Sequence, residues 1–378
     1  MISKIAKILI MLEHSNSGTD SLVNFLDSTS LFTIYFVYPG KPLPTMVLSN
    51  EQAEVIMKLN LVLFTLLCSF NSFAGNGKIE LKNSELQVSL HPDRFAGAIE
   101  SIKWKNKEFI NIFDHGRQLQ SAIQIDGYGE CHNPTEAGSS HDGNSSKTTS
   151  VLTYSSKYSD SKLLVQTQMA QWSFNRLTGA CKKGLDERVK NPLSQHYLNK
   201  TIEIGHNNDP QIIRISLTFA SLETLVSKNI LFELLTGYLN SEFDQFYFLK
   251  DSEILKPEKF NDISGNGFPA GSFQTSSQTP IIQADRSGDY AMGIYFPQDQ
   301  NKNCWGQFQG YVMYKFNLGG HGSNGNATNK WSLAYNENLK SSCFKKEEGY
   351  LKRTFEVYLV VGDLKSVHQK LKNLTGAN

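Results

Sequence analysis

Residues 85–112 read ELQVSLHPDRFAGAIESIKWKNKEFINI, and this stretch carries the pattern that decides the fold class. Leu86, Val88 and Leu90 alternate with polar residues, which gives a β-strand one apolar face. Turn-forming residues interrupt the pattern at 92–97, and a second apolar segment follows at 98–104. Residues 105–107 then turn the chain into 108–112, which predicts a β-hairpin.

Similar segments recur along the rest of the chain, and helical patterns are few. We expect helices only at residues 229–237 and 364–374. Further strands are expected at residues 163–169, 197–204, 212–219, 291–295, 311–316 and 353–361. Many strands without alternating helices favour an all-β fold, a large antiparallel sandwich, over a parallel α/β fold.

The charge balance excludes some functional classes. The 378 residues include 37 Lys and Arg against 36 Asp and Glu, so the net charge is close to zero. Proteins that bind nucleic acids usually carry a basic excess, so we expect no nucleic-acid partner. No apolar run reaches the roughly 18 residues that a membrane-spanning helix needs.

Residues 57–74 have the three parts of an export signal in order. Met57 and Lys58 form a basic start, residues 61–70 an apolar run, and Ser72-Phe73-Ala74 a cleavage site for signal peptidase. The alternative is a buried hydrophobic segment. A signal peptide predicts a secreted or periplasmic protein with one sandwich domain over residues 75–378 and no membrane span after cleavage. Residues 1–56 are then a start assigned too early or a disordered extension.

Export changes how the cysteines are interpreted. Cys68 leaves with the signal, and four cysteines remain: Cys131, Cys181, Cys304 and Cys343. In an oxidising compartment four cysteines allow three pairings, and we expect at least one disulfide. No Cys-x-x-Cys pair occurs, which argues against a zinc site.

Residues 114–143 are the densest chemical segment of the chain. Within it, residues 118–124 predict a strand with Gln118, Gln120 and Gln124 on one face. Amide groups can donate to and accept from sugar hydroxyls, and aromatic rings can stack on a sugar. We therefore predict a substrate-binding set of six residues: His115, Arg117, Gln118, Gln120, Gln124 and Trp172.

The same segment offers groups for acid–base catalysis. His132, Glu136 and His141 are the predicted catalytic residues, because imidazole and carboxyl groups transfer protons near neutral pH. Each histidine has a structural alternative as a simple hydrogen-bonding residue, and Arg117 has one as an ion pair with Asp114 or Glu136. The spacing does not support a metal site, because Pro134 prevents these residues from sharing a helical face.

The strand, turn and hairpin that end in Trp104-Lys-Asn-Lys-Glu-Phe109 resemble the start of galactose-mutarotase-like supersandwich proteins. Residues 114–120 and 133–138 are also similar to an exported subgroup with that architecture. The resemblance covers most of residues 78–363 and implies an antiparallel β-supersandwich. Sugar mutarotases of this kind use a histidine acid, a glutamate base and an arginine that holds the sugar.

The resemblance assigns a role to few individual residues. The family's histidine-containing Phe-Asn-Leu motif is absent here, so no catalytic residue is carried over, and Arg117 is the best positional match to the sugar-binding arginine. We predict an exported protein that binds carbohydrate or acts on it by His/Glu chemistry, as an epimerase or as a relative of polysaccharide lyases or hydrolases. The alternatives are a non-catalytic cell-envelope or glycan interaction domain and a purely structural exported protein. No cofactor is expected.

Overall fold

The computed structural model describes two units of the chain, Met1–Phe73 and Ala74–Asn378. The described residues are 31–34, 37–38, 41–42, 46–49, 77–222, 228–259, 261–262, 271–275, 279–297, 307–315, 328–338, 344–347 and 349–376. In the first unit, β1 (Leu31–Ile34) pairs with β4 (Met46–Ser49), and β2 (Val37–Tyr38) pairs with β3 (Lys41–Pro42). The predicted signal, Cys304 and Cys343 lie outside the described residues.

The stretch that opened the sequence analysis forms a separate small antiparallel sheet. Its strands are β5 (Ile79–Lys82), β6 (Leu86–Leu90), β7 (Ile99–Trp104) and β8 (Lys107–Glu108), with the short helix α2 (Pro92–Phe95) between β6 and β7. Leu86, Val88 and Leu90 are buried, as their alternation predicts. The hairpin between β7 and β8 is confirmed, and its two turn residues have positive φ angles.

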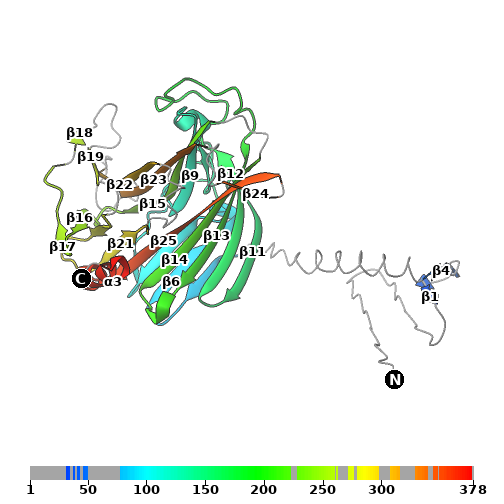
Figure 1. The fold of residues 1–378 in the computed structure, drawn as a ribbon, viewed down its shortest axis with the longest axis horizontal. Coiled ribbons are helices and arrows are strands. Elements are labelled where there is room, and N and C mark those ends of the chain that lie inside the picture. The colour runs from blue at the N-terminus through cyan, green and yellow to red at the C-terminus, as the bar shows by residue number, and fades with distance from the viewer. Residues whose placement is uncertain are drawn as a thin grey trace. The chain divides into compact units, whose positions relative to one another are not determined.

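The remaining strands pair in one antiparallel series that forms two layers (Figure 1). The first layer follows the order β11, β12, β13, β14, β25, β21, β20, β16, β17, and β24 pairs with the start of β25. Its strands are β11 (Val151–Ser159), β12 (Lys162–Gln171), β13 (Leu193–Ile204), β14 (Ile212–Leu222), β16 (Gln245–Lys250), β17 (Glu253–Leu255), β20 (Ile281–Ala284), β21 (Ala291–Tyr295), β24 (Lys345–Glu347) and β25 (Tyr350–Gly362).

The second layer follows the order β9, β15, β23, β22, β19, β18, and the short strand β10 joins β9 to β12. Its elements are β9 (Gln120–Ile125), β10 (Pro134–Thr135), β15 (Asn229–Asn240), β18 (Asn261–Asp262), β19 (Gly271–Gln274), β22 (Gln307–Lys315) and β23 (Thr328–Asn338). Aromatic rings meet between the layers: Phe232 of β15 packs on Phe219 of β14 and Phe355 of β25. The expected all-β antiparallel sandwich is confirmed.

One expected helix is wrong. Residues 229–237 lie in β15, which pairs with β9 on one side and β23 on the other. The apolar residues Ile230, Phe232 and Leu234 alternate into the core, and a register shift at Glu233–Leu235 breaks the simple period of two. Pairing on both edges therefore overrides the local helical pattern.

The other expected helix is confirmed. Helix α3 (Leu364–Thr375) begins at Asp363, whose side chain accepts a hydrogen bond from the Ser366 backbone N–H at 2.9 Å. Val367 and Leu371 are buried in a second apolar cluster with residues of β20, β21 and β25. This helix therefore covers the face of these strands that points away from the main core.

Strand β13 places two ionisable side chains on an apolar face. Its burial alternates without interruption, and the buried residues are Ser194, His196, Leu198, Lys200, Ile202 and Ile204. Leu198, Ile202 and Ile204 belong to the main core. His196 and Lys200 share that face, so the chain needs partners for two buried polar groups there.

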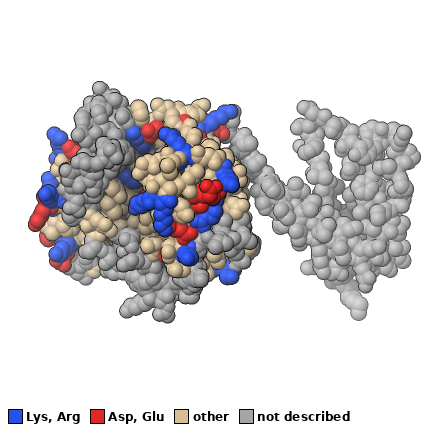
Figure 2. All heavy atoms as spheres, turned by 90° about the horizontal axis from the view of Figure 1, so that it is seen from above, with Lys and Arg blue, Asp and Glu red and all other residues tan. Residues whose placement is uncertain are grey.

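Two surface observations bear on the excluded classes. Among the described residues, no helix combines the length and hydropathy that crossing a membrane requires. Figure 2 shows basic and acidic side chains interspersed on the visible face, with no extended area of a single sign.

Candidate functional site

The segment that runs from the 3-10 helix η1 (Glu130–His132) through β10 lies against β13. The ring of His132 is 6.3 Å from the ring of His196, and the Glu136 carboxylate contacts the Lys200 ammonium at 2.5 Å. His196 and Lys200 are four residues apart in β13, which is about 13 Å in extended chain. The segment therefore delivers two polar groups to the same face of β13, at two separate points.

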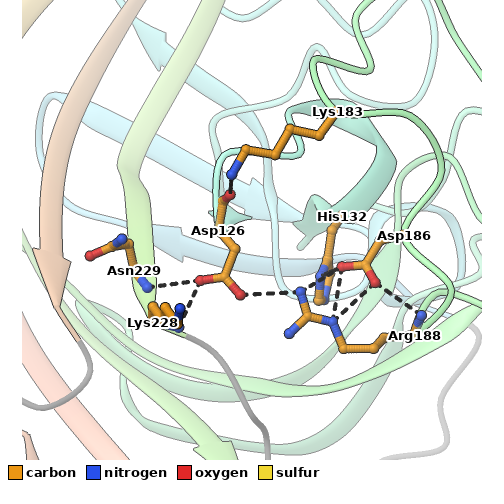
Figure 3. Close-up of polar contacts among 7 residues, drawn as sticks. All are labelled: Asp126, His132, Lys183, Asp186, Arg188, Lys228 and Asn229. Atoms are coloured by element: carbon orange, nitrogen blue, oxygen red, sulfur yellow. Dashed lines mark hydrogen bonds and ion pairs between the residues drawn. The ribbon is translucent and has the colours of Figure 1, made fainter.

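His132 forms a close pair with Asp186. Its Nδ1 atom is 2.5 Å from Asp186 Oδ2, and both side chains are buried, with exposed fractions of 6% and 4% (Figure 3). Asp186 lies on the loop between β12 and β13, 54 residues from His132. The fold brings these two groups together although nothing in their local sequence connects them.

Arg188 fixes the Asp186 carboxylate. Its backbone N–H and its Nε both donate to Asp186 Oδ1 at 3.0 Å, and Nη2 donates to Oδ2 at 2.7 Å. Nη2 also contacts Asp126 Oδ2 at 3.2 Å, and Asp126 accepts hydrogen bonds from the backbone N–H groups of Lys228 and Asn229 (Figure 3). One guanidinium thus links the end of β9, the start of β15 and the loop before β13.

The electrostatics favour an ionised Asp186 and a neutral His132. Burial raises the pKa of Asp186, but the hydrogen bonds from Arg188 outweigh it and bring the pKa below its ordinary value. Burial lowers the pKa of His132, while Asp186 raises it by a smaller amount. A neutral imidazole next to a carboxylate carries its proton on Nδ1, so Nε2 holds a lone pair.

The Nε2 atom of His132 is open. No group among the described residues forms a hydrogen bond with it, and it is not among their enclosed, unpartnered polar atoms. His196 has the same arrangement: its Nδ1 atom bonds to Ser221 Oγ at 2.7 Å, and burial lowers the pKa of His196 to about 3. At this end of β13, neither Nε2 atom has a hydrogen-bond partner among the described residues. We call His132, Asp186, Arg188, His196 and Ser221 the histidine cluster.

Unsatisfied polar atoms lie on the segments that flank the histidine cluster. Asn133 Oδ1, Gln171 Oε1 and Ser173 Oγ are enclosed and have no hydrogen-bond partner. These segments meet through a hydrogen bond from the Trp172 N–H to the Asn133 carbonyl and through the pairing of Pro134 with Gln171. Buried oxygens that lack donors are suited to bind hydroxyl groups or ordered water.

A disulfide ties the two loops of the histidine cluster together. Cys131, which precedes His132, is bonded to Cys181, five residues before Asp186. Backbone contacts reinforce the link, because Gly129 forms a bridge with Cys181 and the Glu130 N–H donates to the Ala180 carbonyl. The expected disulfide is present, and it holds the loop that carries Asp186 against the turn that carries His132.

Glu136 is placed apart from the histidines with which it was predicted to act. Its side chain and that of Lys200 are both fully buried, and Glu136 Oε2 also accepts the Ser121 N–H at 3.1 Å. Burial raises the pKa of Glu136 and lowers that of Lys200, and each group partly offsets the shift of the other. No contact among the described residues joins Glu136 to His132 or His141.

His141, the third predicted catalytic residue, lies on the surface. Its ring is exposed and stacks on Phe174 with the centroids 4.3 Å apart. Neighbouring Asp142 organises this loop by accepting hydrogen bonds from the backbone N–H groups of Ser139 and Thr149. The three predicted catalytic residues thus occupy three different environments.

Most of the predicted substrate-binding residues hold the backbone of the 114–138 region. The ring nitrogens of His115 contact the carbonyls of Gly143 and Arg94, and Arg117 pairs with Asp114 at 3.0 Å. Gln118 bonds to the Gly116 N–H and the Asp114 carbonyl, and Gln120 bonds to the Ala137 N–H and the Gly116 carbonyl.

Gln124 and Trp172 differ from the other four predicted binding residues. Gln124 is half-buried on β9, and its side chain has no hydrogen-bond partner among the described residues. Trp172 is half-buried and covers Gly116, where a Cβ atom would lie 2.7 Å from the indole ring. These two side chains remain available at the surface, and Trp172 is next to two of the unsatisfied oxygens.

Sequence reasoning missed Asp186, Arg188 and His196. Asp186 and Arg188 fall in a loop without periodicity, so no local signal marks them. His196 could have been found, since it shares the inward-facing positions of β13 with Leu198 and Ile202. No group of three or more metal-ligating side chains occurs in the part of the chain that the structure describes.

Comparison with known proteins gives structural matches only. No family model matches the chain, and no curated protein matches it. A TPR-domain containing protein from Parabacteroides distasonis matches with 10% identity and a TM-score of 0.41, covering 76% of this chain and 47% of that one.

Two matched structures are named as glycosidases. They are an alpha-N-acetylgalactosaminidase from Bifidobacterium bifidum (10% identity, TM-score 0.39, 79% of this chain and 39% of that one) and a beta-arabinopyranosidase (8%, 0.35, 76% and 40%). The chain spans less than half of each matched structure. With TM-scores below 0.5, these names describe those proteins and carry no argument for this one.

Proposed function

We propose that this chain is an exported protein that acts on carbohydrate, with His132 accepting a proton from a bound sugar. The observation that carries the proposal is the 2.5 Å contact between Asp186 and His132 Nδ1, which leaves Nε2 unprotonated and without a partner. Such a pair can remove a proton from a hydroxyl group or from a carbon next to a carbonyl, as in mutarotation, epimerisation or elimination.

Each member of the histidine cluster has a defined part in this scheme. His132 is the base, Asp186 holds its tautomer and stabilises the imidazolium that forms, and Arg188 keeps Asp186 ionised. Trp172, which is half-buried, offers a ring for stacking on the sugar. The resemblance of residues 85–109 to mutarotase-like proteins supports a sugar over other polyhydroxy ligands.

The test is a proton-transfer assay on a panel of saccharides. The protein is incubated with mono- and oligosaccharides in deuterated water, and NMR follows anomer exchange, deuterium uptake and new double bonds. We expect His132→Gln and Asp186→Asn to lower the rate by about 10²-fold or more, because a positioned general base contributes about 10²–10⁴-fold. His141→Gln is the matched control and should retain full activity. A His132→Gln protein as active as the unaltered chain would refute the role of His132.

A second function, glycan binding without catalysis, is favoured by one observation. Glu136 is enclosed with Lys200, so the partner predicted for an acid–base pair is not at His132. If the domain only binds, saccharide affinity should persist in the Asp186→Asn protein and no exchange should occur with any member of the panel. Isothermal titration beside the NMR assay separates the two functions.

Export and the domain limits remain part of the proposal. We propose a signal at residues 57–74, a mature domain from Gly75, and residues 1–56 absent from the native protein or retained as an extension. The disulfide supports an oxidising compartment. Amino-terminal sequencing of the native protein should give Gly75, and a sequence that starts within residues 1–56 would contradict the signal.

A further inference from the structure

Tyr128 lies between basic side chains directly before the turn that carries His132. The Lys183 ammonium is 5.7 Å from the centre of the Tyr128 ring, and the Arg188 guanidinium is 5.8 Å from it. The backbone N–H of Lys182 donates to the Tyr128 carbonyl at 3.1 Å. The 182–183 segment is thus held alongside the tyrosine.

The two glycines that flank Tyr128 make this approach possible. Gly127 and Gly129 have positive φ angles of 73° and 66°. A Cβ atom on Gly129 would lie 2.4 Å from the Ala180 carbonyl oxygen, whereas one on Gly127 would make an ordinary contact with Lys183 at 3.4 Å. Gly129 therefore lets the backbone of residues 180–182 approach closely, and the Tyr128 ring has Lys183 and Arg188 next to it.

The loop beside Tyr128 carries an excess of cations, and the acidic residues Asp126 and Glu130 of the neighbouring segment contact it. The loop of residues 176–190 contains five cations (Arg176, Lys182, Lys183, Arg188 and Lys190) and two carboxylates (Asp186 and Glu187). Arg188 forms ion pairs with Asp186 and Asp126. The Lys183 ammonium donates a hydrogen bond to the Asp126 carbonyl oxygen, and the Lys182 side chain has no acidic partner among the described residues. Two ammonium groups thus remain without a carboxylate on an exposed loop.

The position of these groups connects them to the histidine cluster. The disulfide fixes Cys181, which precedes Lys182, to Cys131, which precedes His132. Arg188 contacts both Tyr128 and Asp186, so one side chain belongs to both arrangements. A ligand bound at Tyr128 would therefore contact the same loop that carries Asp186.

We propose that Tyr128, Lys182, Lys183 and Arg188 form a subsite for a sugar unit that carries a carboxylate or sulfate group. The ring supplies a stacking surface, and the lysines supply charge to the anionic substituent. The inference rests on the proposed function for its sugar component. The preference for an anion rests on the charges alone.

The test compares matched ligands that differ only in charge. Affinities are measured for an array of uronate-containing and sulfated oligosaccharides and for their carboxyl-reduced or desulfated counterparts. The affinities for inorganic sulfate and for a single-stranded oligonucleotide are measured as well. We expect the anionic oligosaccharides to bind more tightly than their neutral counterparts, and Lys182→Gln/Lys183→Gln to reduce that difference about three- to tenfold. Tyr128→Ala should weaken binding about fivefold, whereas Tyr128→Phe should not.

The control is Lys250→Gln, which removes one charge from an exposed position on β16. A thermal melt of each variant shows that the fold is retained, and a smaller salt dependence in the double variant reports the lost contacts. The proposal is overturned if no anionic oligosaccharide exceeds its neutral counterpart, or if the oligonucleotide or free sulfate binds equally well. If anionic oligosaccharides bind more tightly but none is converted, only the catalytic proposal is refuted. If only neutral sugars are converted, only the proposal of an anionic subsite is refuted.

Discussion

Two acidic groups form short buried contacts near the same face of β13, and they differ in what surrounds them. Glu136 meets Lys200 where both side chains are fully enclosed, and the pair has no route to a ligand. Asp186 meets His132 at the same distance, but the second nitrogen of the imidazole stays open. The comparison teaches that burial and a short contact alone do not mark a functional pair, because the partner must also keep an unused atom that a ligand can reach.

The largest effect should come from breaking the enclosed pair. Lys200→Met leaves the Glu136 carboxyl buried without its partner, so we expect the free energy of unfolding to fall by about 3–5 kcal/mol. The double variant Glu136→Gln/Lys200→Met removes both charges and should regain most of that loss. Urea denaturation measures both. Lys157→Met, at an exposed ion pair with Asp160, is the control and should change nothing measurable.

An unchanged stability in Lys200→Met would mean that the pair is not part of the folded core. Activity or saccharide binding, measured per folded molecule, should be the same in the double variant as in the unaltered chain. A loss of activity or binding in the double variant would instead place Glu136 in the functional site. The two pairs would then not differ in function.

The second effect concerns the covalent link beside the histidine cluster. Replacing Cys131 and Cys181 by alanine should lower the free energy of unfolding by about 2–4 kcal/mol. Because the link holds the Asp186 loop, backbone amides of residues 182–188 should exchange hydrogen faster, while those around Lys200 should not. Hydrogen-exchange mass spectrometry resolves the two regions. Equal acceleration in both would show that the disulfide stabilises the whole domain and not this loop.

The third effect is a change in how stability depends on pH. The folded protein holds His196 neutral down to a pKa of about 3, whereas an unfolded chain protonates it near 6.5. Between these two pH values, His196 is protonated in the unfolded state and neutral in the folded state. Stability from this group is therefore complete above pH 6.5 and falls by about 1.4 kcal/mol per pH unit as the pH drops.

His196→Gln should reduce that slope, because it removes the titrating ring and retains a hydrogen-bonding group for Ser221. His368→Gln is the control, since His368 lies on α3 and bonds to the Ser252 carbonyl. Urea titrations from pH 8 to pH 4 give the slopes. A slope in His196→Gln equal to that of the unaltered protein would show that the ring is protonated in the folded state.

The sequence predicts the fold better than the site, for physical reasons. Strands such as β12 and β13 alternate inward and outward residues, and alternation is visible in a single segment. The register shift in β15 hides that signal and produced the mistaken helix. Asp186 could not be predicted as the partner of His132, because their contact depends on the loop geometry that the disulfide and Arg188 impose.

One buried ion pair could have been predicted from the sequence, because a charged residue stands among inward-facing apolar ones. Lys200 falls between Leu198 and Ile202 in a strand whose apolar residues point inward, so its position required a buried partner. Of the predicted strand 118–124, residues 120–124 lie in β9, but the amides of Gln118 and Gln120 bind backbone groups instead of being open to a ligand. Polar residues that satisfy neighbouring backbone look the same in sequence as those that bind a substrate.

The alternation of β13 has a consequence for how this protein can fail. His196 and Lys200 share one face with the core residues Leu198, Ile202 and Ile204. A slip of one residue in the pairing of β13 would turn all five side chains outward together. A misregistered chain would thus lose its core, its enclosed ion pair and its histidine cluster in one step, so activity would report directly on correct strand pairing.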